Sequence, residues 1–157
     1  MSRTALRPVE PEDADFLLEL YADTRAEELA PVPWTDAQKR QFIEQQFAAQ
    51  DAAYHENYPD ASFSVITDDG ERIGRIYLTR LDGGELRIID IALLSERRNA
   101  GIGTALIGDV MAEADRDRLT VSLHVEQWNA ALRLYERLGF VRAGENDVYV
   151  RMERPPT

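Results

Sequence analysis

The chain has 157 residues, 44% of them hydrophobic, which suits one domain with a single core. It contains no cysteine, so disulfides, thiolate metal sites and an acyl-cysteine intermediate are excluded, and no metal is expected. Its 29 acidic and 18 basic residues give a net charge of -11, which disfavours nucleic acid as a partner. No stretch has the apolar length of a membrane span, and the first residues lack the apolar core of an export signal. We therefore expect one cytoplasmic domain over residues 1–157, with neither nucleic acid nor membrane as a partner.

The first third of the chain predicts a short strand followed by two helices. Residues 4–9, "TALRPV", alternate weakly between apolar and polar, as in a strand. Apolar residues at helical spacing over 11–29, after a start at Pro11, predict the first helix. Thr35 and Gln38 match a capping box, which predicts the start of a long second helix that ends before "NYPD".

The remainder alternates strand and helix patterns. Strands are predicted at 62–68, 72–81 and 85–94, joined by turns at "DDG" and "DGG", and the simplest arrangement is an antiparallel meander. A helix from Gly101 to about Arg116, a buried strand, a helix from 129 to 138 and two last strands follow. The order is β-α-α-β-β-β-α-β-α-β-β, which predicts an α+β fold on a mixed sheet.

One segment carries chemistry of its own: "RRNAGIGTALIGDV", residues 97–110. It lies between a predicted strand and a predicted helix, where unpaired N–H groups and the helix dipole favour an anion. Gly101 and Gly103 would let the backbone approach a phosphate closely, and Arg97 or Arg98 could add charge. A turn that merely eases packing explains two glycines equally well. A P-loop is excluded because no lysine follows Gly103, and a dinucleotide fingerprint because it lacks the third small residue.

Two motifs together resemble the GNAT superfamily of acyl-CoA N-acetyltransferases. Residues 98–103, "RNAGIG", match the family's Arg/Gln-x-x-Gly-x-Gly/Ala loop after the fourth strand, and residues 129–140, "NAALRLYERLGF", are similar to its fourth helix. The resemblance implies a mixed, mostly antiparallel central sheet flanked by helices. It also implies an enzyme that uses acetyl-CoA as co-substrate. Asn99 stands where the family often has glycine, and asparagine tolerates the left-handed backbone that such a loop requires.

The resemblance implies which residues would hold acetyl-CoA. Backbone N–H groups near Ile91 and Leu93 would bond the pantetheine arm and the acetyl carbonyl, where negative charge develops during attack. Asn129 would contact the arm, act as a helix N-cap, or do both. The pyrophosphate would lie on the N–H groups of Arg98, Asn99, Ala100, Gly101, Ile102, Gly103 and Thr104.

Three residues are candidates for the chemistry. Tyr135 matches the tyrosine that in the family faces the thioester sulfur, where it would donate a hydrogen bond or a proton to the leaving thiolate. The amine must lose a proton, and Asp90 is our first candidate for the base because a carboxylate within an apolar strand is costly unless it is paired. His124 is the second candidate, since histidine titrates near neutrality. A structural ion pair for Asp90 and a structural role for His124 remain alternatives.

The sequence leaves the acceptor open. Acidic and aromatic residues gather in the second predicted helix and before it, where they would suit a cationic amine such as a polyamine, an aminoglycoside or a protein N-terminus. A solvated acidic surface is the alternative interpretation. A module that binds acetyl-CoA without turnover is the alternative function, and a homodimer is possible because family members often dimerise. The candidate acceptor residues are Glu27, Glu28, Trp34, Asp36, Tyr54, Glu56 and Tyr58.

Overall fold

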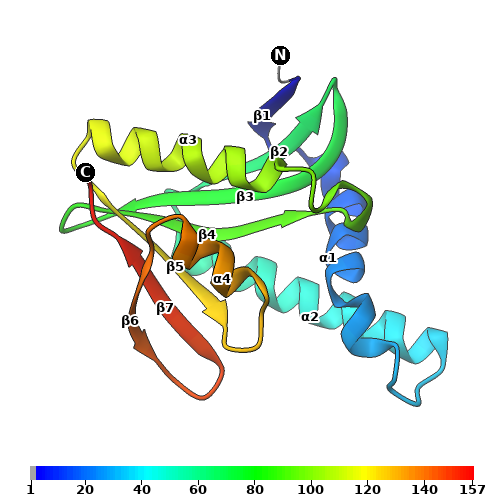
Figure 1. Ribbon diagram of the computed structural model, residues 1–157. Helices are drawn as coiled ribbons and strands as arrows, with labels where there is room; N and C mark the ends of the chain where they lie inside the picture. Colours follow the sequence, from blue (N-terminus) through cyan, green and yellow to red (C-terminus); the bar gives the residue numbers. More distant parts are fainter. Residues whose placement is uncertain (1–2) are drawn as a thin grey trace. The chain divides into compact units, whose positions relative to one another are not determined.

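The computed structural model describes residues 3–157, and its elements follow the predicted order (Figure 1). Most strand and helix bounds lie within one or two residues of the predicted ones, but the first α-helix begins at Ala14, three residues after its predicted start at Pro11. Short 3-10 turns precede two of the helices, at Pro11–Asp13 and Ser95–Arg97. The elements are β1 Thr4–Pro8, α1 Ala14–Leu29, α2 Asp36–Asn57, β2 Ser62–Asp68, β3 Glu71–Leu81, β4 Glu85–Leu93, α3 Ile102–Arg116, β5 Thr120–Glu126, α4 Ala131–Arg137, β6 Val141–Glu145 and β7 Tyr149–Arg154.

The seven strands form a mixed sheet in the order β1-β2-β3-β4-β5-β7-β6. β1 pairs antiparallel with β2, and β7 pairs antiparallel with both β5 and β6. β4 and β5 run parallel. The predicted α+β fold with a mostly antiparallel sheet is therefore confirmed.

By its internal contacts the chain divides into two compact units. The first unit comprises Met1–Tyr77 and Ile91–Gly103, and the second comprises Leu78–Asp90 and Thr104–Thr157. β3 and β4 each contribute residues to both units. That residues 1–157 form one N-acetyltransferase domain stays a prediction.

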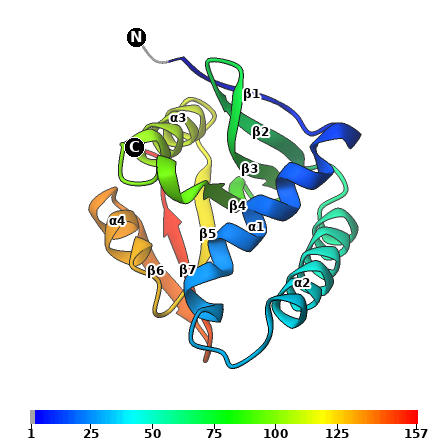
Figure 2. The ribbon, with the colours of Figure 1, turned by 90° about the vertical axis from the view of Figure 1, so that its right-hand side faces the viewer.

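In the first unit, local sequence signals set the helices. The Thr35 hydroxyl accepts a bond from the Gln38 N–H at 3.1 Å, and the Gln38 side chain accepts from the Thr35 N–H at 2.9 Å, which confirms the predicted capping box. Figure 2 shows α1 and α2 side by side, and Tyr21 meets Phe47 between them at 5.8 Å. The core of this unit comprises Leu17, Leu20, Tyr21, Ile43, Val65, Ile66, Ile73, Ile76 and Tyr77.

A buried carboxylate joins the start of the first unit. Asp13 is 1% exposed and takes two bonds of 2.8 Å from the guanidinium of Arg7, with a further one of 3.2 Å from Arg72. Its side chain also accepts a bond from the Glu10 N–H. These donors hold the pKa of Asp13 well below its usual range, chiefly through the bond with Arg7, so this carboxylate stays charged and fixes the approach to α1.

In the second unit, β4, β5 and β7 place alternate side chains on two different faces. One face is apolar, and α4 packs against β5. α4 is shorter than predicted, because the Asn129 side-chain oxygen accepts a bond from the Ala131 N–H at 2.9 Å and so caps the helix from outside it. Every helix within residues 3–157 is too short or too polar to cross a bilayer. The core of this unit comprises Leu86, Ile88, Leu106, Ile107, Val110, Ala114, Val121, Leu123, Val125, Leu132, Tyr135, Phe140, Val150 and Met152.

Candidate active site

The glycine loop, residues 98–103, lies in the first unit and leads into α3. Asn99 has φ 63° and Gly101 has φ 82°, and asparagine and glycine are the residue types that adopt this left-handed region most readily. Among the described residues, no acceptor meets the N–H groups of the five residues Asn99–Gly103. Ile102 and Gly103 form the first turn of α3, whose N–H groups have no partner within a helix. Five adjacent donors at the positive end of a helix dipole make an anion-binding surface.

The two arginines before the loop bind the protein itself. Arg97 pairs with Asp68 at 2.7 Å and with Glu71 at 3.0 Å. Arg98 donates from Nε to the Leu93 carbonyl at 3.1 Å and from its other end to Asp23 at 3.3 Å. Both guanidinium groups thus hold the segment that leads into the loop, and a contribution of their charge to a bound phosphate stays a prediction.

The end of β4 in the first unit directs backbone donors away from β3. The Leu94 N–H bonds to the Ile73 carbonyl of β3 at 2.9 Å. Because successive residues of a strand direct their N–H groups to opposite edges, the N–H groups of Leu93 and Ile91 lie at the other edge of β4. The Leu93 carbonyl lies there too, since Arg98 binds it. Ile91 and Leu93 thus present their donors at the same edge of β4, and their bonds to a pantetheine arm stay a prediction.

Tyr135 is buried in the second unit, on α4. Its side chain is 8% exposed, and its ring meets that of Phe140 at 5.6 Å. Burial, together with the negative charge of Asp90, raises the pKa of Tyr135 to about 12. The hydroxyl is therefore protonated and able to donate at any physiological pH. The negative charge of Asp90 thus acts on Tyr135, and both residues lie in the second unit.

The two candidate bases lie on opposite faces of the sheet in the second unit. β4 and β5 pair with Leu86 opposite Val121 and Arg87 opposite Ser122. Since side chains alternate, Asp90 shares the apolar face of Leu86, whereas His124 shares the face of Ser122. Only Asp90 is thus on the face that packs against α4. β4 and β5 pair over residues 85–87 and 120–122, and both strands continue beyond this pairing.

His124 is exposed beside a polar network on the other face, and the charges of that network act on it. Glu85 accepts bonds from the Ser122 hydroxyl, from Arg87 at 2.9 Å and from Arg151 at 3.2 Å. Loss of solvent around the imidazole, together with the charges of Arg87 and Arg151, lowers the pKa of His124. His124 is consequently neutral near pH 7 and chemically able to accept a proton, but its neighbours form a balanced set of ion pairs typical of a structural cluster.

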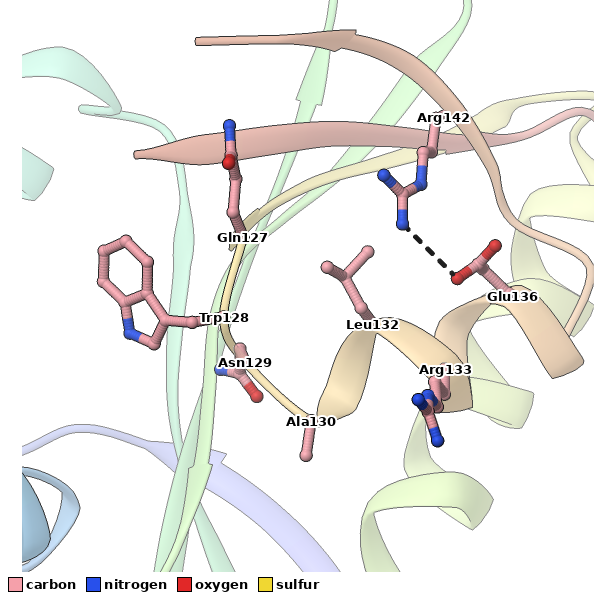
Figure 3. Close-up of a pocket in the computed structure, with 8 residues that line it drawn as sticks. All are labelled: Gln127, Trp128, Asn129, Ala130, Leu132, Arg133, Glu136 and Arg142. Carbon is pink, nitrogen blue, oxygen red and sulfur yellow. Dashed lines mark ion pairs between the residues drawn. The ribbon is translucent and has the colours of Figure 1, made fainter. Parts of the chain in front are cut away.

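Asn129 lies at the turn between β5 and α4, beside a surface pocket of about 410 Å³. Figure 3 shows Leu132 pointing into this pocket and Trp128 pointing away from α4. A long ion pair of 3.8 Å between Arg142 and Glu136 closes one side. The remaining lining residues are Gln127, Ala130 and Arg133. Because the Asn129 side chain caps α4, its amide group is held in place beside the pocket.

The candidate acceptor residues all lie in the first unit, and several are already engaged. Glu28 pairs with Arg25 at 3.1 Å, and Trp34 meets Phe42 at 5.4 Å. Tyr54 meets the edge of Tyr77 at 6.0 Å. Glu27 and Asp36 are exposed on the surfaces of α1 and α2, as is Glu56, while Tyr58 follows α2 directly.

Two residues with structural roles near the loop and the end of β4 were not predicted from the sequence. Asp23 of α1 binds Ser95 and Arg98, more than 70 residues away in the chain, and no local pattern marks such a contact. Gly74 of β3 lies so close to β4 that a Cβ there would overlap the Ala92 carbonyl oxygen, midway between Ile91 and Leu93. An isolated glycine within a strand pattern does signal a close backbone approach, so Gly74 had a usable signal.

Comparison with known proteins agrees with this geometry. The sequence model of the acetyltransferase (GNAT) family matches residues 17–140, which is more than half of the chain. None of the curated proteins compared matches it. Among solved structures, a PaiA N-acetyltransferase from Thermoplasma acidophilum in complex with coenzyme A has a TM-score of 0.74 at 18% identity, covering 99% of both chains. A chimera of the spermidine N-acetyltransferase SpeG from Vibrio cholerae with hSSAT has a TM-score of 0.68 at 22% identity, covering 98% of this chain and 96% of that one.

Ard1 from Thermoplasma volcanium is also similar, with a TM-score of 0.65 at 21% identity over 99% of both chains. At these identities the likeness concerns the fold, and the family match concerns the sequence. The chain belongs to the acetyltransferase (GNAT) family, and it is by class an acetyltransferase.

Proposed function

We propose that the protein transfers the acetyl group of acetyl-CoA directly to a primary amine of a small molecule or peptide, within a ternary complex. The observation that carries this proposal is the row of five N–H groups at Asn99–Gly103 that meet no acceptor among the described residues. They lie in the segment that matches the family's cofactor loop, and a CoA complex is known for a protein of the same fold. The absence of cysteine supports direct transfer, because a thioester intermediate on the enzyme has no residue to form on.

Acetyl-CoA would be held by backbone groups. The pyrophosphate would lie on the N–H groups from Arg98 to Thr104, of which the Arg98 N–H also bonds the Ser95 carbonyl at 3.3 Å. The arm would follow the edge of β4 that faces away from β3, at Ile91 and Leu93. Asn129, fixed by its own cap of α4, would contact the arm through its amide. The Leu93 and Ile91 donors would stabilise the acetyl carbonyl oxygen as it gains negative charge.

The reaction would need one bond formed and one broken. The amine nitrogen attacks the thioester carbon, the carbon–sulfur bond breaks, and the electron pair leaves on the sulfur of CoA. The nitrogen loses a proton to a base, for which Asp90 is our first candidate because it lies on the face of Tyr135. His124 is the second. If substitution of either residue leaves turnover unchanged, that residue has a structural role.

Tyr135 would stabilise the leaving thiolate by a hydrogen bond. With its pKa near 12, complete proton transfer to a thiolate of ordinary pKa would be uphill by about 5 kcal/mol. A donated hydrogen bond carries no such cost, and the buried site strengthens it. The proton that finally reaches the sulfur would then come from solvent or from the protonated base.

For the acceptor we propose a cationic amine. The net charge of -11 favours a cation, and the exposed carboxylates of Glu27, Asp36 and Glu56 lie on α1 and α2, the helices between β1 and β2. The spermidine N-acetyltransferase among the structures of the same fold is consistent with a polyamine, at an identity that supports the fold alone. We therefore place polyamines first among the acceptors to be tried, before aminoglycosides and peptides.

The proposal is tested by acetyl-CoA-dependent release of free thiol, followed with a chromogenic disulfide reagent. The chain itself contains no thiol, so all signal comes from CoA. We expect thiol release with at least one amine of a panel of polyamines, aminoglycosides and peptides, and an acetylated product by mass spectrometry. Tight binding of acetyl-CoA with no thiol release for any amine would contradict turnover and favour the non-catalytic binding module.

A further inference from the structure

Asp23 lies where a carboxylate is electrostatically unfavourable for the proposed function. It is bonded to Arg98, the residue at which the proposed pyrophosphate loop begins. A negative charge beside a site for a phosphate weakens binding of that phosphate by Coulomb repulsion. The contacts of the Asp23 carboxylate explain why it lies beside the loop.

The carboxylate of Asp23 holds the segment before the loop at two points. Its Oδ2 accepts a bond of 2.7 Å from the Ser95 N–H, and its Oδ1 accepts one of 2.9 Å from the Ser95 hydroxyl. Ser95 begins a 3-10 turn, whose first N–H has no partner within the turn. Asp23 therefore caps this turn from another helix, as an N-cap side chain would do locally.

The second point is Arg98, which ends the same turn. Its guanidinium donates to Asp23 at 3.3 Å and to the Leu93 carbonyl at 3.1 Å. One carboxylate thus fixes both the start and the end of the turn from Ser95 to Arg97, and through Arg98 it connects that turn to the end of β4. The Asp23 side chain is 28% exposed, so these charge-assisted bonds are partly shielded from water.

We propose that Asp23 is a positioning residue that pre-orders the glycine loop for acetyl-CoA. This inference rests on the proposed function. Without the carboxylate, Ser95 and Arg98 lose their shared anchor, and residues 99–103 must be ordered when the ligand binds. Ordering a loop on binding costs affinity. Asp23 makes no contact with the reacting atoms in this account, so its effect concerns acetyl-CoA binding and leaves the chemical step unchanged.

The sign of the effect distinguishes the two roles of the charge. If the Asp23 charge acts only through its field, Asp23→Asn removes a repulsion and tightens acetyl-CoA binding. If Asp23 positions the loop, the same variant weakens binding. We expect a Kd for acetyl-CoA about tenfold higher in Asp23→Asn, the size of effect expected from losing a charge-assisted hydrogen bond.

The experiment is isothermal titration with acetyl-CoA, combined with steady-state kinetics. The matched control is Asp15→Asn, which removes the same charge from an exposed position on the same helix. We expect the KM for acetyl-CoA to rise in Asp23→Asn, with kcat and the KM for the amine near wild type, and Asp15→Asn to change none of them. Ser95→Ala, which removes one of the three bonds, should weaken binding in the same direction by less.

Unchanged or tighter acetyl-CoA binding by Asp23→Asn overturns this inference while the wild-type protein binds normally. A wild-type protein that fails to bind acetyl-CoA overturns the proposed function, and the variants then carry no information beyond it. Thermal unfolding without ligand shows whether Asp23→Asn folds. If it does not, Ser95→Ala decides, and normal acetyl-CoA binding by that variant contradicts the inference.

Discussion

The glycine loop and the surroundings of Tyr135 differ in the kind of polar group that each presents. In the loop the N–H groups of Asn99–Gly103 meet no acceptor within residues 3–157, and the side chains of Arg97 and Arg98 bind the protein. Around Tyr135 the side chain itself is the polar group, and it is buried with its pKa raised to about 12. The loop residues would therefore act through their backbone, whereas Tyr135 would act through its side chain. Changes in the loop should therefore alter acetyl-CoA affinity, and changes around Tyr135 should alter turnover.

The largest effect is expected at Asp90. Asp90→Asn keeps the shape of the side chain but removes the proton acceptor, and loss of a general base lowers kcat by about 100-fold or more. The matched control is Asp109→Asn, an exposed carboxylate on α3 of the same unit, which should turn over normally. His124→Gln should stay within about threefold of wild type in kcat. The reverse pattern, with a slow His124→Gln and an active Asp90→Asn, would assign the base to the other face of the sheet.

The next effect is expected at Gly103 and concerns affinity. A Cβ at Gly103 would lie 3.8 Å from Leu93, an ordinary contact, so the protein accommodates a side chain there. A bound phosphate would be blocked by that side chain, because the phosphate must approach the backbone N–H groups closely. Gly103→Val should therefore weaken acetyl-CoA binding by about 100-fold, equivalent to losing two hydrogen bonds.

The control for this loop variant is Gly108→Ala, which adds a Cβ further along the same helix where nothing lies within 4 Å. It should bind acetyl-CoA as the wild type does. A folded Gly103→Val protein with wild-type affinity would remove the loop from the cofactor site.

Tyr135→Phe should give a smaller effect, on turnover alone. The ring keeps its packing against Phe140, while the hydroxyl that would bond the thiolate is lost. We expect kcat to fall by about tenfold to 100-fold, as for one hydrogen bond to a charged group, with the Kd for acetyl-CoA unchanged. Stopped-flow or steady-state thiol release measures the rate. An unchanged kcat would show that Tyr135 is only a packing residue.

The smallest effect is a titration on the polar face. The charges of Arg87 and Arg151 and the loss of solvent lower the pKa of His124, so its NMR titration should fall below the usual value of about 6.5. Arg151→Gln should raise that midpoint, whereas Asp90→Asn, on the opposite face, should leave it in place. Because the unfolded chain binds this proton more tightly, His124 contributes a loss of stability as the pH falls below about 6.5. A midpoint that follows Asp90 instead would contradict the two-face assignment.

The fold was predictable from the sequence because its signals are local. The capping box of Thr35, the turn glycines and the alternation of the strands act within a few residues, and each produced the expected element. The partners of charged side chains were not predictable in this way. Asp23 meets Ser95 and Arg98 only after α1 has packed, and the separation of Asp90 from His124 depends on the register of β4 and β5. The resemblance to the family identified Tyr135 and the loop as candidates. The contacts of Asp23 that hold the loop became visible only in the tertiary structure.

Binding of acetyl-CoA by the glycine loop can be tested through the shift of the melting temperature with acetyl-CoA, with NADH and ATP as controls. Ligand at about a hundredfold over its Kd stabilises the folded state by about 2.7 kcal/mol, which is several degrees for a chain of this size. We predict a shift for acetyl-CoA that NADH and ATP do not reproduce. No shift at saturating acetyl-CoA would contradict the account and leave the two glycines as structural residues.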